Sequence, residues 1–239
     1  MKTCVCFYGL VHRSLGFTLA NLKRNLLFDD PDVYIHTFDN KISHSIRGGE
    51  PPTAVDPADI LKLNPIKYRI DSEDEFNSSF DFKKYEDYGD PWVRDKGGSQ
   101  TIHNLLRGLH SLREVWAMID RTKKYDRIIM SRADLLFSAP LKLYNIPSNT
   151  IITSKHDCDP LINHNDMFAV GTWDSLEKWA NRLDYADEFC TWINQLQGYP
   201  HHGMHPETFV TYIISRFKTR SVTTSIRSIR CRATGEYVV

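Results

Sequence analysis

The segment Arg132-Ala133-Asp134 places an arginine and an aspartate two residues apart, directly after a short apolar run. That run, residues 127–130, is rich in β-branched residues and follows a helical pattern, which predicts a buried strand. Ligands of open α/β sheets bind at the carboxyl ends of the strands. A carboxylate placed there beside an arginine is suited to hold a divalent cation or a diphosphate. The alternative is an ion pair at the surface end of a strand.

A second candidate site follows the first predicted strand, residues 3–8. Gly9 opens a turn, Arg13 lies in it, and Ser14 is positioned to cap a helix that runs to about residue 28. A strand, a glycine turn and a helix start form a place to hold a phosphate, and Arg13 would add positive charge. The segment is not a P-loop and lacks the full Gly-X-Gly-X-X-Gly pattern. Arg13 as a solvated residue at a helix start is the competing interpretation.

Three histidines, His201, His202 and His205, fall within five residues near the C-terminal end. One of them would supply a second metal ligand beside Asp134, although the spacing of a structural zinc site is missing. Pro206 suits the first position of a helix, and Glu207 suits its positive amino end.

The elements that must position these residues alternate between strand and helix. Further strands are predicted at residues 33–38 and 150–154, and helices at 99–120, 174–196 and from 206 onward. Ser99 is the expected N-cap of the first of these helices. Asp174 and Glu177 are expected to form a capping box for the second. This order predicts an α/β fold with a mostly parallel central sheet flanked by helices.

Residues 40–98 interrupt this order and are expected to form an insertion. A short helix at 56–63 and a short strand at 66–70 are predicted within it, and residues 72–90 are acidic and aromatic. That last part is expected at the surface near the site, either as a lid or acceptor wall or as an ordinary packed loop. The basic tail, residues 216–232, either reaches an anionic ligand or forms a solvated edge strand.

The composition of the chain argues against some classes of function. Thirty basic residues balance thirty acidic ones, which argues against a nucleic-acid partner. No apolar run is long enough to span a membrane, and the first strand leaves no room for a signal peptide. The five cysteines form no Cys-X-X-Cys pair and are expected as buried thiols of a reducing compartment. We therefore expect a soluble, cytoplasmic protein.

The order of these motifs resembles the GT-A glycosyltransferases, in particular small polysaccharide glycosyltransferases of bacteria and large DNA viruses. Arg132-Ala133-Asp134 is similar to their Asp-X-Asp motif with arginine in place of the first acid. Further similar motifs are Cys6-Phe7-Tyr8-Gly9 with Arg13, the second strand from Asp32 to Phe38, Asn165-Asp166-Met167-Phe168-Ala169-Val170-Gly171, and His205-Pro206-Glu207.

The resemblance implies one GT-A-like domain over residues 1–239, with a donor-binding half at 1–134 and an acceptor-side half at 135–239. It implies a hexosyl- or pentosyltransferase that moves a sugar from a nucleotide-diphosphate donor to a glycan, a glycoprotein or another hydroxyl acceptor. Mn²⁺ or Mg²⁺ would neutralise the leaving diphosphate. Because Arg132 replaces an acid, the metal would be weakly bound or dispensable, and Arg132 could itself stabilise the diphosphate.

The resemblance also assigns roles to residues. Gly9 and Arg13 would shape the nucleotide loop, Asp39 would touch the base or ribose, and Gln100 and Arg132 would contact the donor. Asp134 and His205 would bind the metal. On the acceptor side, Asp166 is the preferred base because inverting transfer needs a carboxylate to take the acceptor proton, with Glu207 as the second candidate. The alternative for Asp166 is a cap at the start of a strand.

Two functions from other classes stay open. A sulfotransferase would also bind phosphates at the first loop, but Leu10-Val11-His12-Arg13 matches its phosphate loop poorly. A non-catalytic nucleotide- or sugar-binding module would keep the fold without turnover.

Overall fold

The computed structural model describes residues 1–46, 49–89, 91, 99–154, 164–196 and 203–238. Its strands are β1 (Thr3–Tyr8), β2 (Asp32–Phe38), β3 (Ile42–Ser45), β4 (Glu50–Ala54), β5 (Lys67–Asp71), β6 (Arg127–Arg132), β7 (Leu135–Phe137), β8 (Thr150–Ser154), β9 (Phe168–Gly171), β10 (Arg220–Thr224), β11 (Ser228–Cys231) and β12 (Tyr237–Val238). Its α-helices are α1 (Leu15–Asn25), α2 (Glu73–Ser79), α3 (Phe82–Glu86), α4 (Ser99–Met118), α5 (Trp173–Ala180), α6 (Ala186–Gln195) and α7 (Pro206–Arg216). Short 3₁₀ helices are η1 (Val11–Ser14), η2 (Pro57–Leu63) and η3 (Arg182–Tyr185).

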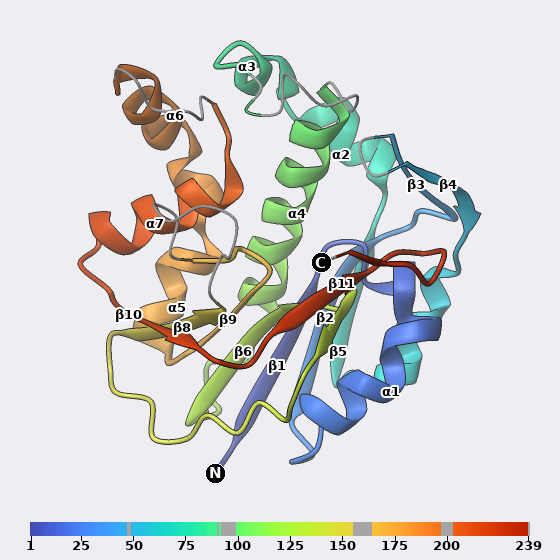
Figure 1. Cartoon of the computed structure of the whole chain (residues 1–239), viewed down its shortest axis with the longest axis vertical. Helices are drawn as coiled ribbons and strands as arrows, with labels where there is room; N and C mark the ends of the chain where they lie inside the picture. The colour runs from blue at the N-terminus through green and yellow to red at the C-terminus, as the bar shows by residue number, and fades with distance from the viewer. Residues whose placement is uncertain (47–48, 90, 92–98, 155–163, 197–202, 239) are drawn as a thin grey trace.

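A seven-stranded sheet in the order β10-β8-β9-β6-β1-β2-β5 forms the centre of the molecule (Figure 1). β9 runs antiparallel to β6 and β8, and the other neighbouring strands are parallel. Every residue of β1 is buried, as expected for an apolar strand covered on both faces. The structure therefore confirms the predicted α/β fold with a mostly parallel sheet.

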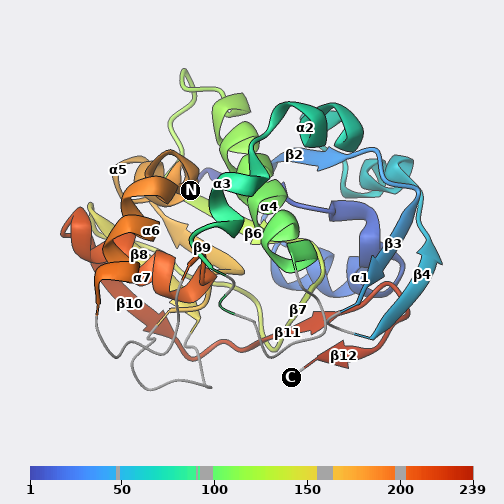
Figure 2. The same cartoon turned by 90° about the horizontal axis from the view of Figure 1, so that it is seen from above.

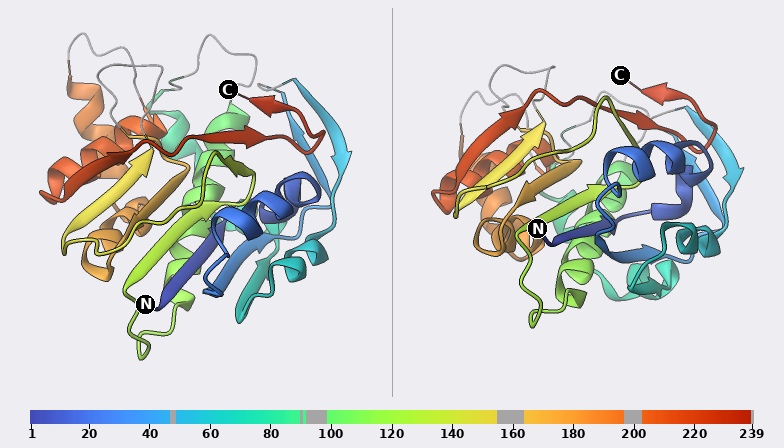
Figure 3. Two further views of the ribbon diagram at one scale, coloured as in Figure 1. Left: turned by 60° about the horizontal axis from the view of Figure 1, so that its bottom comes forward. Right: turned by 90° about the horizontal axis from the view of Figure 1, so that it is seen from below.

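Helices cover both faces of this sheet (Figures 1 and 3). On one face, α4, α5 and α7 contribute Trp116, Trp179 and Val210 to a buried cluster. On the other, α1 and η2 contribute Leu15, Leu22 and Ile60. The apolar faces of α1 and α4 are thus the faces that pack on the sheet. α4 begins at Ser99, so the expected cap residue is the first residue of the helix itself.

The C-terminal segment crosses from one part of the molecule to another. β10 is an edge strand of the main sheet, and the chain then passes to β11, which pairs antiparallel with β7 in a three-stranded sheet (Figure 3). The basic tail is therefore two strands in different sheets. This arrangement carries Arg230 to the carboxyl end of β6.

The long helix predicted for residues 174–196 is wrong. α5 ends at Ala180, η3 follows, and α6 begins at Ala186. The break separates two packing regions: Leu176 and Trp179 of α5 belong to one buried cluster, whereas Leu183 of η3 and Phe189 of α6 belong to another.

Ser14 is the N-cap residue of α1 as predicted, but its side chain does not cap the helix, and the predicted capping box of α5 is wrong. Thr172 is the N-cap of α5, and its N–H donates to the Ser175 hydroxyl at 3.0 Å, whereas Asp174 accepts from the Asn149 N–H at 2.6 Å. The Ser14 hydroxyl caps no helix and donates to the Cys231 carbonyl at 2.8 Å. In both cases the side chain that was expected to cap a helix forms a hydrogen bond with a residue distant in sequence.

The segment expected as an insertion contains the β3–β4 hairpin, η2, β5, α2 and α3. β5 pairs in parallel with β2 and forms an edge of the main sheet. Phe76 of α2 and Tyr85 of α3 are buried, so these helices pack on the body of the protein. Within the described residues, no helix combines the length and apolarity needed to cross a bilayer.

Candidate functional site

A pocket of about 890 Å³ opens at the edge of the main sheet where β1 and β6 end. The register of these strands sets Tyr8 opposite Arg132. The amino ends of α4 and α7 also line the pocket, as do β3 and Arg230 of β11, and Figure 2 shows α4 between α7 on one side and β3 on the other. Strand ends and helix amino ends together favour an anionic ligand.

The pocket brings together most of the residues that the sequence singled out. Gly9, Arg13, Arg132 and Asp134 line it at the sheet edge, and Gln100, Asp166, His205 and Glu207 line it from the other elements. Asp39 does not line it: its carboxylate accepts the Glu73 N–H at 3.0 Å, at the start of α2. The structure therefore does not bring Asp39 together with the other predicted site residues, and the next residue, Asn40, lines the pocket.

The first loop is fixed by its backbone. Gly9 has φ +83°, a conformation that favours glycine, and its N–H donates to the Ser111 hydroxyl at 2.8 Å. Arg13 is not a solvated helix-start residue, because its guanidinium pairs with the buried carboxylate of Glu50. Burial, together with the neighbouring Arg230, lowers the pKa of Arg13 to about 9, so it stays charged at neutral pH.

Asp134 lies among guanidinium groups. Its carboxylate accepts two hydrogen bonds from Arg132, at 2.9 and 2.5 Å, and one from Arg230 at 3.2 Å. Arg13 lies 3.9 Å from the same carboxylate. Burial opposes ionisation of Asp134, but the charges of Arg132 and Arg230 outweigh it and hold its pKa below the usual range. Asp134 is 2% exposed, so the Arg132–Asp134 ion pair is not a solvated pair at the surface.

This arrangement does not fit the divalent cation expected at Asp134. A Mg²⁺ or Ca²⁺ ion needs about six or more oxygen ligands, whereas both carboxylate oxygens of Asp134 already accept hydrogen bonds from arginines. His205 is the N-cap of α7, where its Nδ1 accepts from the Thr208 N–H at 3.4 Å and its Nε2 lies 3.6 Å from Glu207. His201 and His202 lie outside the described residues. Pro206 occupies the predicted first helical position.

A group of possible metal ligands lies elsewhere among the described residues. Ligand atoms of His36, Asp71 and His110 lie within 4.8 Å of one another, and none of the three lines the pocket. Asp71 already accepts two hydrogen bonds from Arg69, at 2.7 and 2.5 Å, and its Oδ2 lies 3.0 Å from His36 Nε2. These hydrogen bonds therefore explain why Asp71 and His36 lie close together.

Asp166 and Glu207 also line the pocket, and their carboxylates interact electrostatically. Burial, and the negative charge of Glu207, raise the pKa of Asp166 to about 6. The Tyr8 hydroxyl donates to the backbone carbonyls of Asp166 and Met167, at 3.0 and 3.2 Å, which fixes the chain before β9. A carboxylate that titrates near neutral pH is suited to accept a proton from a hydroxyl group.

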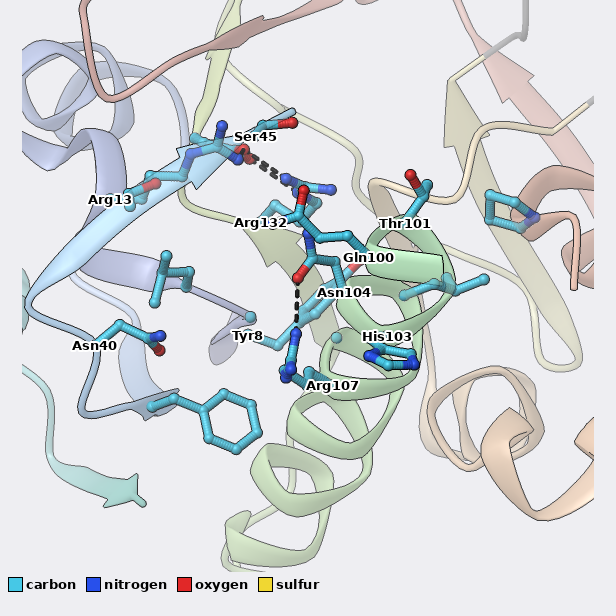
Figure 4. A pocket seen from close by; sticks show the side chains of 18 of the residues that line it. Tyr8, Arg13, Asn40, Ser45, Gln100, Thr101, His103, Asn104, Arg107 and Arg132 are labelled. Carbon is cyan, nitrogen blue, oxygen red and sulfur yellow. Dashed lines mark hydrogen bonds and ion pairs between the residues drawn. The ribbon is translucent and has the colours of Figure 1, made fainter. Parts of the chain in front are cut away.

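The start of α4 forms a polar wall (Figure 4). The Gln100 amide oxygen accepts from the Ile46 N–H at 3.2 Å, and its nitrogen lies 2.8 Å from His44 Nε2, which links α4 to the region of β3. Arg107 donates to Asn104 and Asn77 at 2.9 and 2.8 Å. This wall offers side-chain amides and an arginine to a polar ligand.

Comparisons with known proteins give structural likeness only. No protein-family model matches the chain, and no curated protein matches it in sequence. Two solved structures are similar to it. One is the apo form of the glycosyltransferase GlyE of Streptococcus pneumoniae TIGR4, with 9% identity, a TM-score of 0.46, and coverage of 93% of this chain and 45% of that one. The other is the apo form of mouse xyloside xylosyltransferase 1, with 10% identity, a TM-score of 0.42, and coverage of 93% and 84%. This chain thus spans less than half the length of the first.

Three charged residues of the site escaped sequence interpretation. Glu50 lies in an irregular segment with no local signal. Arg182 is 1% exposed, and its charge lowers the pKa of Asp166 from beneath the pocket. Arg230 was recognisable only as part of a basic tail. The one sequence signal for Arg182 is its position beside Leu183, within a helical stripe that is otherwise apolar.

Proposed function

We propose that this protein is a glycosyltransferase that uses a nucleotide-diphosphate sugar as donor and a hydroxyl of a glycan or glycoprotein as acceptor. The observation that carries the proposal is the placement of an arginine cluster and a carboxylate pair in one pocket. Arg132 and Arg230 lie at one side of the pocket, and Asp166 and Glu207 line it as well. The volume of about 890 Å³ lies within the range of roughly 300–1,000 Å³ usual for ligand sites.

In the proposed reaction, the acceptor oxygen attacks the anomeric carbon of the donor sugar. The bond between that carbon and the β-phosphate oxygen breaks, and its electron pair stays on the departing nucleoside diphosphate. Asp166 takes the acceptor proton, and its raised pKa makes it a stronger base than an exposed aspartate. Gly9 and Arg13 shape the nucleotide loop, and Gln100 lies where the donor would pass.

The arginines receive the negative charge that develops on the leaving group. Arg132 carries its full charge at neutral pH: burial opposes this, but Asp134 raises its pKa above the ordinary value. Fixed charges aimed at a developing anion stabilise the transition state without reorganisation. Mn²⁺ or Mg²⁺ at this position stays a sequence-based prediction, and the step above does not use either ion.

The first test is a thermal-shift panel of UDP, GDP, dTDP and CMP and their sugar conjugates, with and without MnCl₂. A ligand at a hundredfold its Kd stabilises the fold by about 2.7 kcal/mol, which is a measurable rise in Tm. We expect one nucleotide family to raise Tm. A panel in which none does would contradict the proposed function.

Asp166→Asn separates an enzyme from a binding module. The variant should bind the donor as the native protein does but release nucleoside diphosphate from it about 10²–10⁴-fold more slowly, because the general base is lost. Donor turnover, with water or an added glycan as acceptor, is the measurement. Asp74→Asn, an exposed aspartate of α2 outside the pocket lining, is the control. Native protein that binds the donor without turnover would favour the non-catalytic module.

A further inference from the structure

Positive charge exceeds negative charge at the donor side of the pocket. Among the described residues, the ion pairs of Asp134 and Glu50 involve four guanidinium groups, those of Arg13, Arg132, Arg230 and Arg232, so this network carries two more positive than negative charges. Arg13, Arg132, Asp134 and Arg230 of the network line the pocket. Asp134 and Glu50 are 2% and 4% exposed, so water screens these charges weakly. A chain with zero formal net charge concentrates cations at this one place.

Backbone contacts fix the guanidinium of Arg230 in this cluster. β11 pairs with β7 so that Arg230 lies opposite Leu135, the residue after Asp134. The Cys231 N–H donates to the Asp134 carbonyl at 2.7 Å, and the Cys231 carbonyl accepts from the Ser14 hydroxyl at 2.8 Å. The strand register therefore holds Arg230 beside Asp134 whether or not a ligand is bound.

Within the part of the chain that the structure describes, the hydrogen-bonding capacity of these arginines is only partly used. A guanidinium offers five N–H donors, and those of Arg132 toward Asp134 are its Nε and one Nη. Arg230 uses its Nε toward the same carboxylate. Both residues line the pocket. Planar guanidinium groups bind phosphate oxygens through paired hydrogen bonds, so two neighbouring arginines suit a diphosphate.

We propose that Arg132 and Arg230, positioned by Asp134, bind the donor diphosphate directly and take the place of a divalent cation in the transfer reaction. This inference rests on the proposed function. When the sugar–oxygen bond breaks, the electron pair adds negative charge to the β-phosphate, and the two guanidinium groups balance it. Asp134 is then a positioning residue that orients both arginines, not a metal ligand.

The experiment measures the Kd of UDP, GDP and dTDP by calorimetry, in EDTA and in MnCl₂, for native protein and for Arg230→Gln. We expect equal affinity in the two buffers. Arg230→Gln should weaken the diphosphate roughly tenfold to a hundredfold, the loss expected for a hydrogen bond to a charged group. The affinity of the corresponding nucleoside, which lacks phosphate, should stay unchanged. Inorganic pyrophosphate should compete with the diphosphate in EDTA.

Arg227→Gln is the matched control, because it removes the same charge from an exposed position of the same segment, outside the pocket lining. Asp134→Asn tests the positioning role and should weaken the diphosphate while leaving nucleoside affinity intact. Arg230→Lys serves if the glutamine variant has a lowered Tm without ligand; it should weaken the diphosphate less.

The outcomes separate the two proposals. Binding that requires Mn²⁺ would overturn the arginine inference and leave the transferase intact. Metal-independent binding that Arg230→Gln and Arg227→Gln alter equally would also overturn it. If none of the three diphosphates binds in either buffer, the proposed function fails, and this inference fails with it.

Discussion

At the scale of single residues, the pocket holds two aspartates in different electrostatic surroundings. Asp134 is stabilised as an anion by arginines, whereas Asp166 is destabilised as an anion by burial and by Glu207. Two aspartates of one pocket therefore differ in proton affinity, and such a difference is typical of acid–base sites. The sequence offered both aspartates as candidates but contained no sign of this difference, because it depends on burial and on Glu207 and Arg230, which are distant in sequence from the aspartates they act on.

The pH dependence of turnover follows from Asp166. A base must be ionised to accept a proton, and its pKa is raised to about 6. We expect kcat/KM to fall about tenfold for each pH unit below 6 and to level off above it. Donor hydrolysis measured from pH 4.5 to 8 checks this.

Glu207→Gln should move that inflection to lower pH, because the variant removes the negative neighbour that disfavours ionised Asp166. Glu177→Gln, on α5 and outside the pocket lining, should leave it in place. An inflection that stays near pH 6 in Glu207→Gln would contradict the coupling of the two carboxylates.

At the scale of elements, the strands that carry the site were the most predictable part. β1, β2, β6 and β8 are short apolar or β-branched runs, and their types follow from composition alone. β7, β11 and the β3–β4 hairpin were not predicted. β7 has three residues, and its partner β11 lies about ninety positions away, with Leu136 opposite Ile229. Such pairing depends on the tertiary fold and leaves no local pattern.

The link between α4 and the first loop yields a prediction. The Ser111 hydroxyl accepts from the Gly9 N–H and donates toward His36, whose Nδ1 lies 2.9 Å away and whose carbonyl lies at the same distance. Ser111→Ala leaves these buried groups without their partner, so the free energy of unfolding should fall by about 1–3 kcal/mol. The KM for the donor should rise because the Gly9 turn loosens.

Urea unfolding and donor kinetics measure the two effects of Ser111→Ala. Ser78→Ala is the control: its exposed hydroxyl bonds only within its own helix, so stability should change by less than about 0.5 kcal/mol. An unfolding midpoint of Ser111→Ala equal to that of the native protein would show that the loop is held by other contacts.

At the scale of the whole molecule, the fold buries chemically reactive groups as well as apolar ones. Cys4, Cys6, Cys190 and Cys231 are free thiols with 0% exposure. This confirms that these cysteines are buried, whereas the reducing compartment stays a prediction. Burial raises the pKa of the Cys4 thiol well above its ordinary value, and the reactive species is the thiolate.

We therefore expect Cys158→Ser, which keeps only those four thiols, to react with Ellman's reagent after unfolding in guanidinium and not in the native state. The time course at pH 8 measures this, and its rate should follow the rate of unfolding as temperature rises. Fast reaction of any thiol in the folded variant would show that part of this core opens locally.

The position of Arg230 also has a consequence for the order of assembly. Ser14 and Cys231 are bonded across 217 positions of the chain, and closing so large a loop is entropically costly. A folding chain can form β1, β2 and β6 early, yet the donor side of the pocket gains its second arginine only when β11 docks on β7. Nucleotide binding would then be acquired in the last step of folding, and release of a nucleotide would be an early sign that the C-terminal strands have detached.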